Sequence, residues 1–202
     1  MRRWLVTVVA VLAVVVGCGS DDEEPARPLD AAAPPGFTVV QDETIGFAVS
    51  VPESWRQLPT EIGSFDGVAE GLRRDNERMG PPLTQLKGAV REGARLAVVD
   101  PATGSTANLI VLPSDSDLDD MASGAAIRLR QTGATGLTQE KTTLDGVPAI
   151  RQRFRVQYPG TGGSVELQES QYYVVRRGRA FILTLVGQSP DLDRIATSLQ
   201  LA

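Results

Sequence analysis

The distribution of apolar residues divides the chain into an apolar leader, a polar stretch and a long patterned segment. An unbroken apolar run extends from Trp4 to Val16, and residues 19–36 then hold almost no large apolar side chain. From Phe37 onward, short apolar segments alternate with turn-forming Gly, Pro and Asp residues. Alternating segments predict strands, and apolar positions three or four apart predict helices. The pattern therefore predicts one folded domain over residues 37–202.

Short apolar segments bounded by turn residues predict the strands. Asp145-Gly146 and Arg177-Gly178 each separate two such segments, at the spacing of a tight hairpin. Residues 180–186 are apolar on both faces apart from Thr184, which predicts a central strand covered on both sides. The predicted strands cover residues 37–40, 46–51, 94–99, 108–112, 136–144, 147–158, 164–176 and 179–186.

Helical spacing of apolar residues occurs in the segments 66–79, 117–131 and 190–199. Pro81-Pro82 is expected to interrupt the first of these helices, because proline lacks an N–H group and is disfavoured inside a helix. Apolar residues after the two prolines restart the helical spacing. Antiparallel hairpins with helices before and after them predict an α+β fold, with a mainly antiparallel sheet and helices on both faces.

The apolar leader has the length of a secretory signal peptide. As a helix it reaches about 20 Å, which is short of the ~30 Å hydrocarbon core of a membrane. Two arginines precede it, as in a positive n-region. It ends at Val15-Val16-Gly17-Cys18, which resembles the bacterial lipobox. The alternative is an ordinary secretory signal that contains a cysteine by chance.

The lipobox resemblance implies a membrane anchor. A peptidase would cleave between Gly17 and Cys18, and the Cys18 thiol would carry a diacylglycerol, with fatty acyl chains such as palmitate holding the protein at the membrane. Residues 18–36 are acidic and proline-rich, a composition typical of a disordered tether. We therefore expect a lipoprotein at the cell membrane that faces the extracytoplasmic side, with a signal peptide at residues 1–17.

Composition excludes several classes of chemistry. The chain has no His and one Cys, so it can form neither a Ser-His-Asp triad, nor an imidazole metal site, nor an internal disulfide. Its net charge of −5 argues against nucleic acid as a partner. The acids of residues 115–120 lack the Gly and Glu of a calcium loop, and Ser116 or Asp117 is expected to cap the following helix instead. We expect no catalytic residue, no metal and no cofactor.

Several segments resemble one family. IGFAVSVPESW, LDGVPAIRQRF, QYYVVRRGRAFILTL and IATSLQL are similar to the PsbP-like (Mog-type) α/β/α sandwich, which occurs in bacterial lipoproteins, including actinobacterial ones of the LpqN kind. The resemblance covers residues 37–202 and rests on pattern, since the family shares no catalytic motif. It implies a non-enzymatic module that binds partner proteins or hydrophobic envelope components.

Arg151, Arg153 and Arg155 alternate along one predicted strand and would share one face. Three guanidinium groups on one face can hold an anion such as phosphate or carboxylate. The alternative is a surface ladder in which Glu166 and Glu169 of the next strand neutralise the arginines. The sequence leaves both interpretations open.

Two adjacent tyrosines offer a further candidate for ligand contact. Tyr172 and Tyr173 lie in a predicted strand, where successive side chains point to opposite faces. One of them is therefore expected to be buried in the core and the other to be available at the surface.

These observations favour a membrane-anchored lipoprotein that acts as a non-catalytic binding or scaffold module. Its partner would be an envelope protein or a lipid-like ligand that enters between sheet and helices. The alternatives are a small cell-envelope hydrolase and an accessory subunit of a membrane transport complex.

Overall fold

A computed structural model describes residues 28–29, 32–160 and 163–202. The predicted signal peptide, the predicted cleavage and lipidation site at Gly17 and Cys18, and most of the predicted tether lie outside the described residues. Among the helices that are described, none is long and apolar enough to cross a membrane.

The order of elements follows the predicted order closely. The strands are β1 (Phe37–Asp42), β2 (Phe47–Pro52), β3 (Arg56–Gln57), β4 (Ala94–Val99), β5 (Thr106–Pro113), β6 (Thr135–Leu144), β7 (Val147–Gly160), β8 (Gly163–Arg176), β9 (Arg179–Val186) and β10 (Gln200–Leu201). The helices are α1 (Ile62–Asp75), a short 3-10 helix η1 (Glu77–Met79), α2 (Gly80–Arg91), α3 (Leu118–Gln131) and α4 (Asp191–Thr197).

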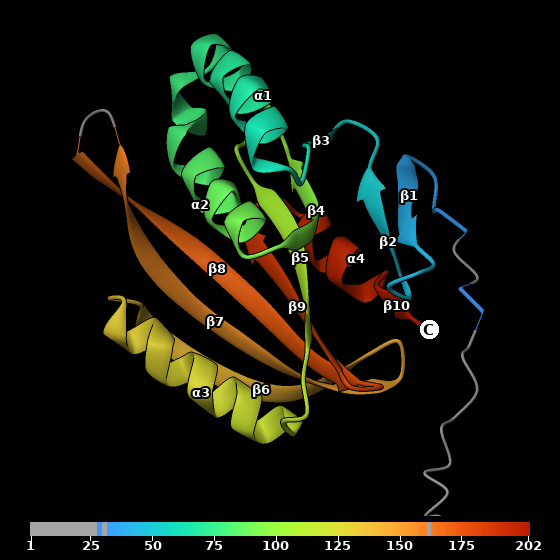
Figure 1. Cartoon of the computed structure of the whole chain (residues 1–202). Coiled ribbons are helices and arrows are strands. Elements are labelled where there is room, and N and C mark those ends of the chain that lie inside the picture. Colours follow the sequence, from blue (N-terminus) through green and yellow to red (C-terminus); the bar gives the residue numbers. More distant parts are fainter. Residues whose placement is uncertain (1–27, 30–31, 161–162) are drawn as a thin grey trace, which may run out of the picture.

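The strands form two antiparallel sheets, which Figure 1 shows with their covering helices. The larger sheet has the order β3-β4-β5-β9-β8-β7-β6, and the smaller has the order β1-β2-β10. Strand β9 lies in the middle of the larger sheet, between β5 and β8. The central position predicted for residues 180–186 is therefore confirmed.

Apolar side chains cover the larger sheet on both faces. On one face, residues of β4, β5, β8 and β9 pack with the smaller sheet and with Ile195 of α4. On the other face, α1 and α2 pack over β4 and β5, and α3 packs over β7 and β8. The predicted α+β class, with a mainly antiparallel sheet and helices on both faces, is confirmed. The second sheet was not predicted, because β10 has only two residues.

The first helical region differs from its prediction. The helix begins at Ile62, ends at Asp75 and is followed by Asn76 in an extended conformation. The Asn76 side chain accepts a hydrogen bond from the Arg78 backbone N–H and so starts η1. Pro81 and Pro82 begin α2 rather than interrupt a helix, because the first turn needs no internal N–H donors.

The described residues contain a complete core. Every core cluster lies between Phe37 and Leu201, and so does every strand pair. Trp55 and Phe65 are both buried within this core. A segment with its own core and its own strand pairing is expected to fold alone, so residues 32–202 are a suitable unit for experiments; they are called the domain below.

Candidate functional site

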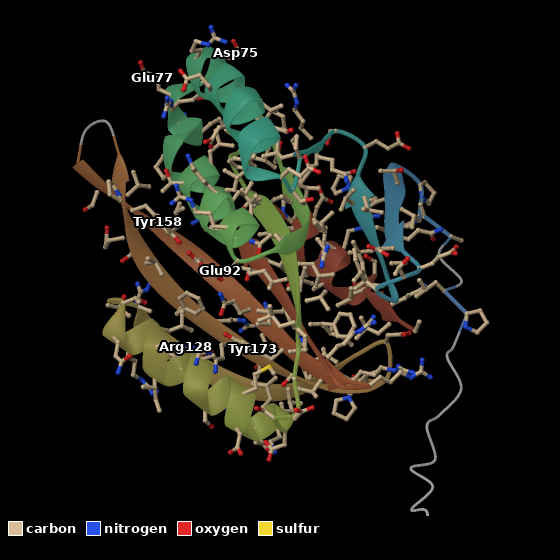
Figure 2. All side chains as sticks on the ribbon, in the orientation of Figure 1. Asp75, Glu77, Glu92, Arg128, Tyr158 and Tyr173 are labelled. Carbon is tan, nitrogen blue, oxygen red and sulfur yellow. The ribbon has the colours of Figure 1, made fainter. Side chains whose placement is uncertain are left out.

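A groove crosses the larger sheet between the end of α2 and helix α3; Figure 2 labels three of its lining residues, Glu92, Arg128 and Tyr173. Its volume is about 310 Å³. Strands β5, β8 and β9 form the floor, and the two helix regions form the walls. The lining residues are Glu92, Ile110, Ala125, Arg128, Leu129, Thr132, Gln171, Tyr173, Ile182 and Thr184.

The strand register places apolar and polar rows side by side on the groove floor. Ile110, Ile182 and Tyr173 lie opposite one another on β5, β9 and β8. The next row on the same face contains Thr184 and Gln171, which are also cross-strand neighbours. A ligand in the groove would therefore meet apolar contact and hydrogen-bonding groups within one short span.

Tyr173 lies at the junction of the groove floor and α3. Its hydroxyl donates a hydrogen bond to Gln171 Oε1. Burial raises the pKa of Tyr173, and the nearby positive charge of Arg128 opposes that increase. Arg128 and Glu92 stand on opposite walls, and within the described ranges neither lies within 4 Å of an opposite charge.

The prediction that one of the adjacent tyrosines is available at the surface was wrong. Tyr172 is 5% exposed and Tyr173 is 2% exposed. Tyr172 packs in the core with Trp55, and Tyr173 packs under α3. Alternation places the two rings on opposite faces, but helices and the second sheet cover both faces of β8.

Arg151, Arg153 and Arg155 share one face of β7, and each has a carboxylate partner. Arg151 lies 3.3 Å from Asp193 and 3.7 Å from Glu140. Its guanidinium also lies over the Tyr172 ring, 5.1 Å from the centroid. Arg151 is thus held between α4, β6 and β8, and its side chain is only 18% exposed.

The two remaining arginines have one carboxylate partner each. Arg153 lies 3.4 Å from Glu140, and Arg155 lies 3.7 Å from Glu166. The anion site suggested for these arginines stays a prediction, and an incoming anion would have to compete with these carboxylates.

Glu169 does not neutralise the arginines, contrary to the alternative drawn from the sequence. Glu169 of β8 is the cross-strand partner of Phe154 on β7. Its side chain therefore lies on the other face of the sheet from Arg153 and Arg155. The reason is the two-residue period of a strand, which places Glu166 and Glu169 on opposite faces.

Glu169 instead forms a buried pair that the sequence analysis missed. It is 3% exposed, and its carboxylate accepts a hydrogen bond of 2.7 Å from the Tyr158 hydroxyl. Burial raises the pKa of Glu169 from 4.5 to about 7, against a smaller lowering by the Tyr158 hydrogen bond. Burial and the Glu169 charge also raise the pKa of Tyr158. In the sequence, Tyr158 stands at the end of a predicted strand beside a glycine-rich turn, and nothing at that position predicts a contact with Glu169.

Metal ligation and helix capping can be assessed for the described residues. In those ranges there is no cluster of three or more Cys, Asp or Glu side chains that could hold a metal ion. Asp117 caps α3, because its side chain accepts a 2.7 Å hydrogen bond from the Asp120 backbone N–H. The capping role predicted for Ser116 or Asp117 therefore belongs to Asp117.

Comparisons with known proteins identify the fold. No family model and no curated protein matches the chain. The solution structure of cyanobacterial PsbP (CyanoP) from Synechocystis sp. PCC 6803 matches with a TM-score of 0.53 and 16% identity, over 88% of this chain and 99% of that one. LpqN of Mycobacterium tuberculosis, described as involved in cell envelope biogenesis, has a TM-score of 0.44 and 17% identity, over 82% and 90%. The fold assignment rests on the first of these.

Proposed function

We propose that this chain, which has a PsbP-like fold, is a membrane-anchored extracytoplasmic lipoprotein whose domain binds a hydrophobic ligand without a chemical step. The observation that carries this proposal is the groove between α2 and α3. Its volume falls at the lower end of the range of small-molecule sites, which bury most of a ligand against apolar side chains and orient it with a few polar groups.

The lining of the groove fits a ligand with an apolar part and a polar part. Ile110, Ile182 and Leu129 offer apolar contact. Gln171 and Thr184 offer hydrogen bonds beside them. In the part of the chain that is described, the Thr184 hydroxyl and the Gln171 amide nitrogen have no hydrogen-bond partner, so both remain able to bind a ligand.

The groove residues support binding rather than catalysis. Thr132 is a hydroxyl side chain on the wall, and its Oγ1 already donates to the Leu129 carbonyl over 3.0 Å. The Tyr173 hydroxyl is engaged by Gln171. With no histidine in the sequence, no imidazole base can activate either hydroxyl.

The proposed anchor rests on the Val15-Val16-Gly17-Cys18 motif. From Cys18 to Phe37 the chain can extend at most about 65 Å, at ~3.4 Å per residue. The chain enters the domain at β1, on the side of the larger sheet that carries the smaller sheet (Figure 1). The residues that line the groove lie on the other side of that sheet, with α2 and α3. The anchor therefore leaves the groove open to a ligand or a partner.

Native mass spectrometry of protein isolated from membranes tests ligand binding. We expect a bound small molecule in the wild type and its loss in Leu129→Trp, because the indole fills the groove. Ile127→Trp is the matched control, since Ile127 is on the same helix, is 54% exposed and does not line the groove. Equal ligand content in both variants would refute the groove as the binding site.

The anchor is tested separately on the membrane fraction. We expect the mature protein to begin at Cys18 with a lipid adduct on its thiol, and Cys18→Ser to abolish both the adduct and the cleavage after Gly17. An unmodified cysteine, or a mature start elsewhere, would contradict the anchor and leave the groove proposal intact.

A further inference from the structure

A second pocket, remote from the groove, lies at the turn between β8 and β9. We infer that it is an anion site that binds a phosphate group. The pocket has a volume of about 250 Å³. It is lined by the β1–β2 turn, residues 43–46, by Arg176, Arg177 and Arg179, and by Phe181 and Ala202. The sequence suggests only a solvated hairpin end at this place, and the inference does not depend on the groove.

Two of these arginines oppose each other directly. Arg176 and Arg179 are cross-strand partners at the end of the β8–β9 hairpin, so both side chains lie on the same face of the sheet. Both are half-buried. Like charges in directly opposite positions repel and destabilise a sheet unless an opposite charge lies between or beside them.

The described residues form no ion pair with either of these two arginines, although Glu43 and Ala202 line the same pocket. Neither Arg176 nor Arg179 has a carboxylate within 4 Å in the described ranges. Glu43 lines the same pocket but forms no ion pair there with either arginine. This contrasts with Arg151, which lies within 4 Å of two carboxylates.

The β1–β2 turn holds one of the guanidinium groups in place. Arg179 Nη1 donates to the backbone carbonyl oxygens of Ile45 and of Thr44, the latter over 3.3 Å. Carbonyl oxygens orient a guanidinium without neutralising it. Arg179 is therefore positioned at the pocket with its positive charge still available to a ligand.

The turn itself places a third arginine at the pocket. Arg177 has a φ of 50°, in the left-handed region that Gly, Asn and Asp occupy most easily. The equivalent position of the β6–β7 hairpin holds Asp145, with a φ of 52°. With this turn, all three arginines line the pocket.

Phosphate is the anion that this arrangement fits best. Guanidinium groups bind phosphate through planar, charge-assisted hydrogen bonds. A phosphate monoester presents three terminal oxygens for such contacts, and the phosphodiester of a phospholipid headgroup presents two. The phosphate group could belong to a soluble phosphate ester or to a phospholipid headgroup, and the experiment distinguishes these sources.

The test uses the domain and two matched variants. Binding of inorganic phosphate and of glycerol 3-phosphate is measured by calorimetry. Binding to phosphatidylcholine vesicles, with and without phosphatidylglycerol, is measured by sedimentation. The double variant Arg176→Gln/Arg179→Gln removes the opposed pair. Arg56→Gln/Arg95→Gln removes the same charge at exposed positions of β3 and β4, outside both the groove and this pocket, and is the control variant.

We expect the wild-type domain to bind a phosphate probe, and the hairpin variant to lose affinity on the order of tenfold. The control variant should stay near wild type. Added phosphate should raise the melting temperature of the wild type but not of the hairpin variant. Binding of inorganic phosphate or glycerol 3-phosphate assigns the site to soluble ligands. Binding restricted to vesicles that contain phosphatidylglycerol assigns it to a membrane surface.

Two results would overturn the inference. One is the absence of binding to every phosphate probe. The other is an equal loss of binding in the hairpin variant and the control variant, which would show attraction to positive charge in general. The melting curve without phosphate provides a check on folding. Removal of the opposed charges relieves their repulsion, whereas Arg179→Gln loses the hydrogen bonds to Thr44 and Ile45, so a cooperative transition is the criterion that the hairpin variant is folded.

Discussion

Glu169 should make the stability of the domain fall as the pH rises toward neutral. The pKa of Glu169 is raised from 4.5 to about 7 in the folded protein, because burial disfavours the carboxylate. Between these two pH values the folded state binds more protons than the unfolded state, so the free energy of unfolding decreases with rising pH. The difference of about 2.5 pH units corresponds to about 3 kcal/mol. The loss begins near pH 4.5 and is complete above pH 7.

Glu169→Gln isolates this effect. The amide keeps the shape of the side chain and an acceptor oxygen for the Tyr158 hydroxyl, but it does not ionise. We expect the variant to gain about 3 kcal/mol over the wild type between pH 4 and pH 8. Urea unfolding of the wild-type domain and of the variant across this pH range measures the difference in their free energies of unfolding. The titration of all other groups cancels in this difference.

A direct titration of the carboxyl carbon of Glu169 by NMR checks the same reasoning. The midpoint should lie near pH 7. A midpoint below pH 5 would refute the reasoning, and so would a difference in free energy of unfolding between wild type and Glu169→Gln that stays constant with pH. Either result would show that the buried carboxylate is stabilised by more than the Tyr158 hydrogen bond.

Three further substitutions test other contacts. Tyr158→Phe removes the 2.7 Å hydrogen bond to Glu169 and should cost about 1–3 kcal/mol at pH 8 but less at pH 4, a trend that urea unfolding at both values reveals. Asp117→Ala removes the cap of α3 and should lower the free energy of unfolding by ~1 kcal/mol. Asp119→Ala, a control in the same turn that leaves the cap in place, should lower it less. Gly187→Ala should lower the melting temperature strongly, because its Cβ would lie 2.5 Å from Ser105 Oγ at a φ of +107°; a value near that of the wild type would contradict this geometry.

The sequence predicted the order of the elements because their signals are local. The turn at Asp145-Gly146, the central strand at 180–186 and the cap at Asp117 all follow from residues close together in the chain. The same locality limited the prediction around Pro81-Pro82. There Asn76, which the spacing of apolar residues does not single out, ends α1 in an extended conformation, and its side chain starts η1.

The sequence predicted the groove only in part. A ligand entering between sheet and helices was expected, but its location follows from the strand register. Ile110, Gln171 and Ala125 are far apart in sequence and line one pocket because β5, β8 and α3 meet there. Register and helix placement are long-range properties, so a local pattern does not determine them.

The sequence alone determined the leader motif, the absence of histidine chemistry, and which side chains of one strand share a face. Only the tertiary structure decided what covers each face. It buried both Tyr172 and Tyr173, enclosed Glu169 with Tyr158, and left Arg176 opposite Arg179 without a carboxylate partner among the described residues. The physical reason is that alternation along a strand specifies to which face each side chain points. Burial, pKa and ion pairing depend instead on helices and strands from distant parts of the chain that pack against that face.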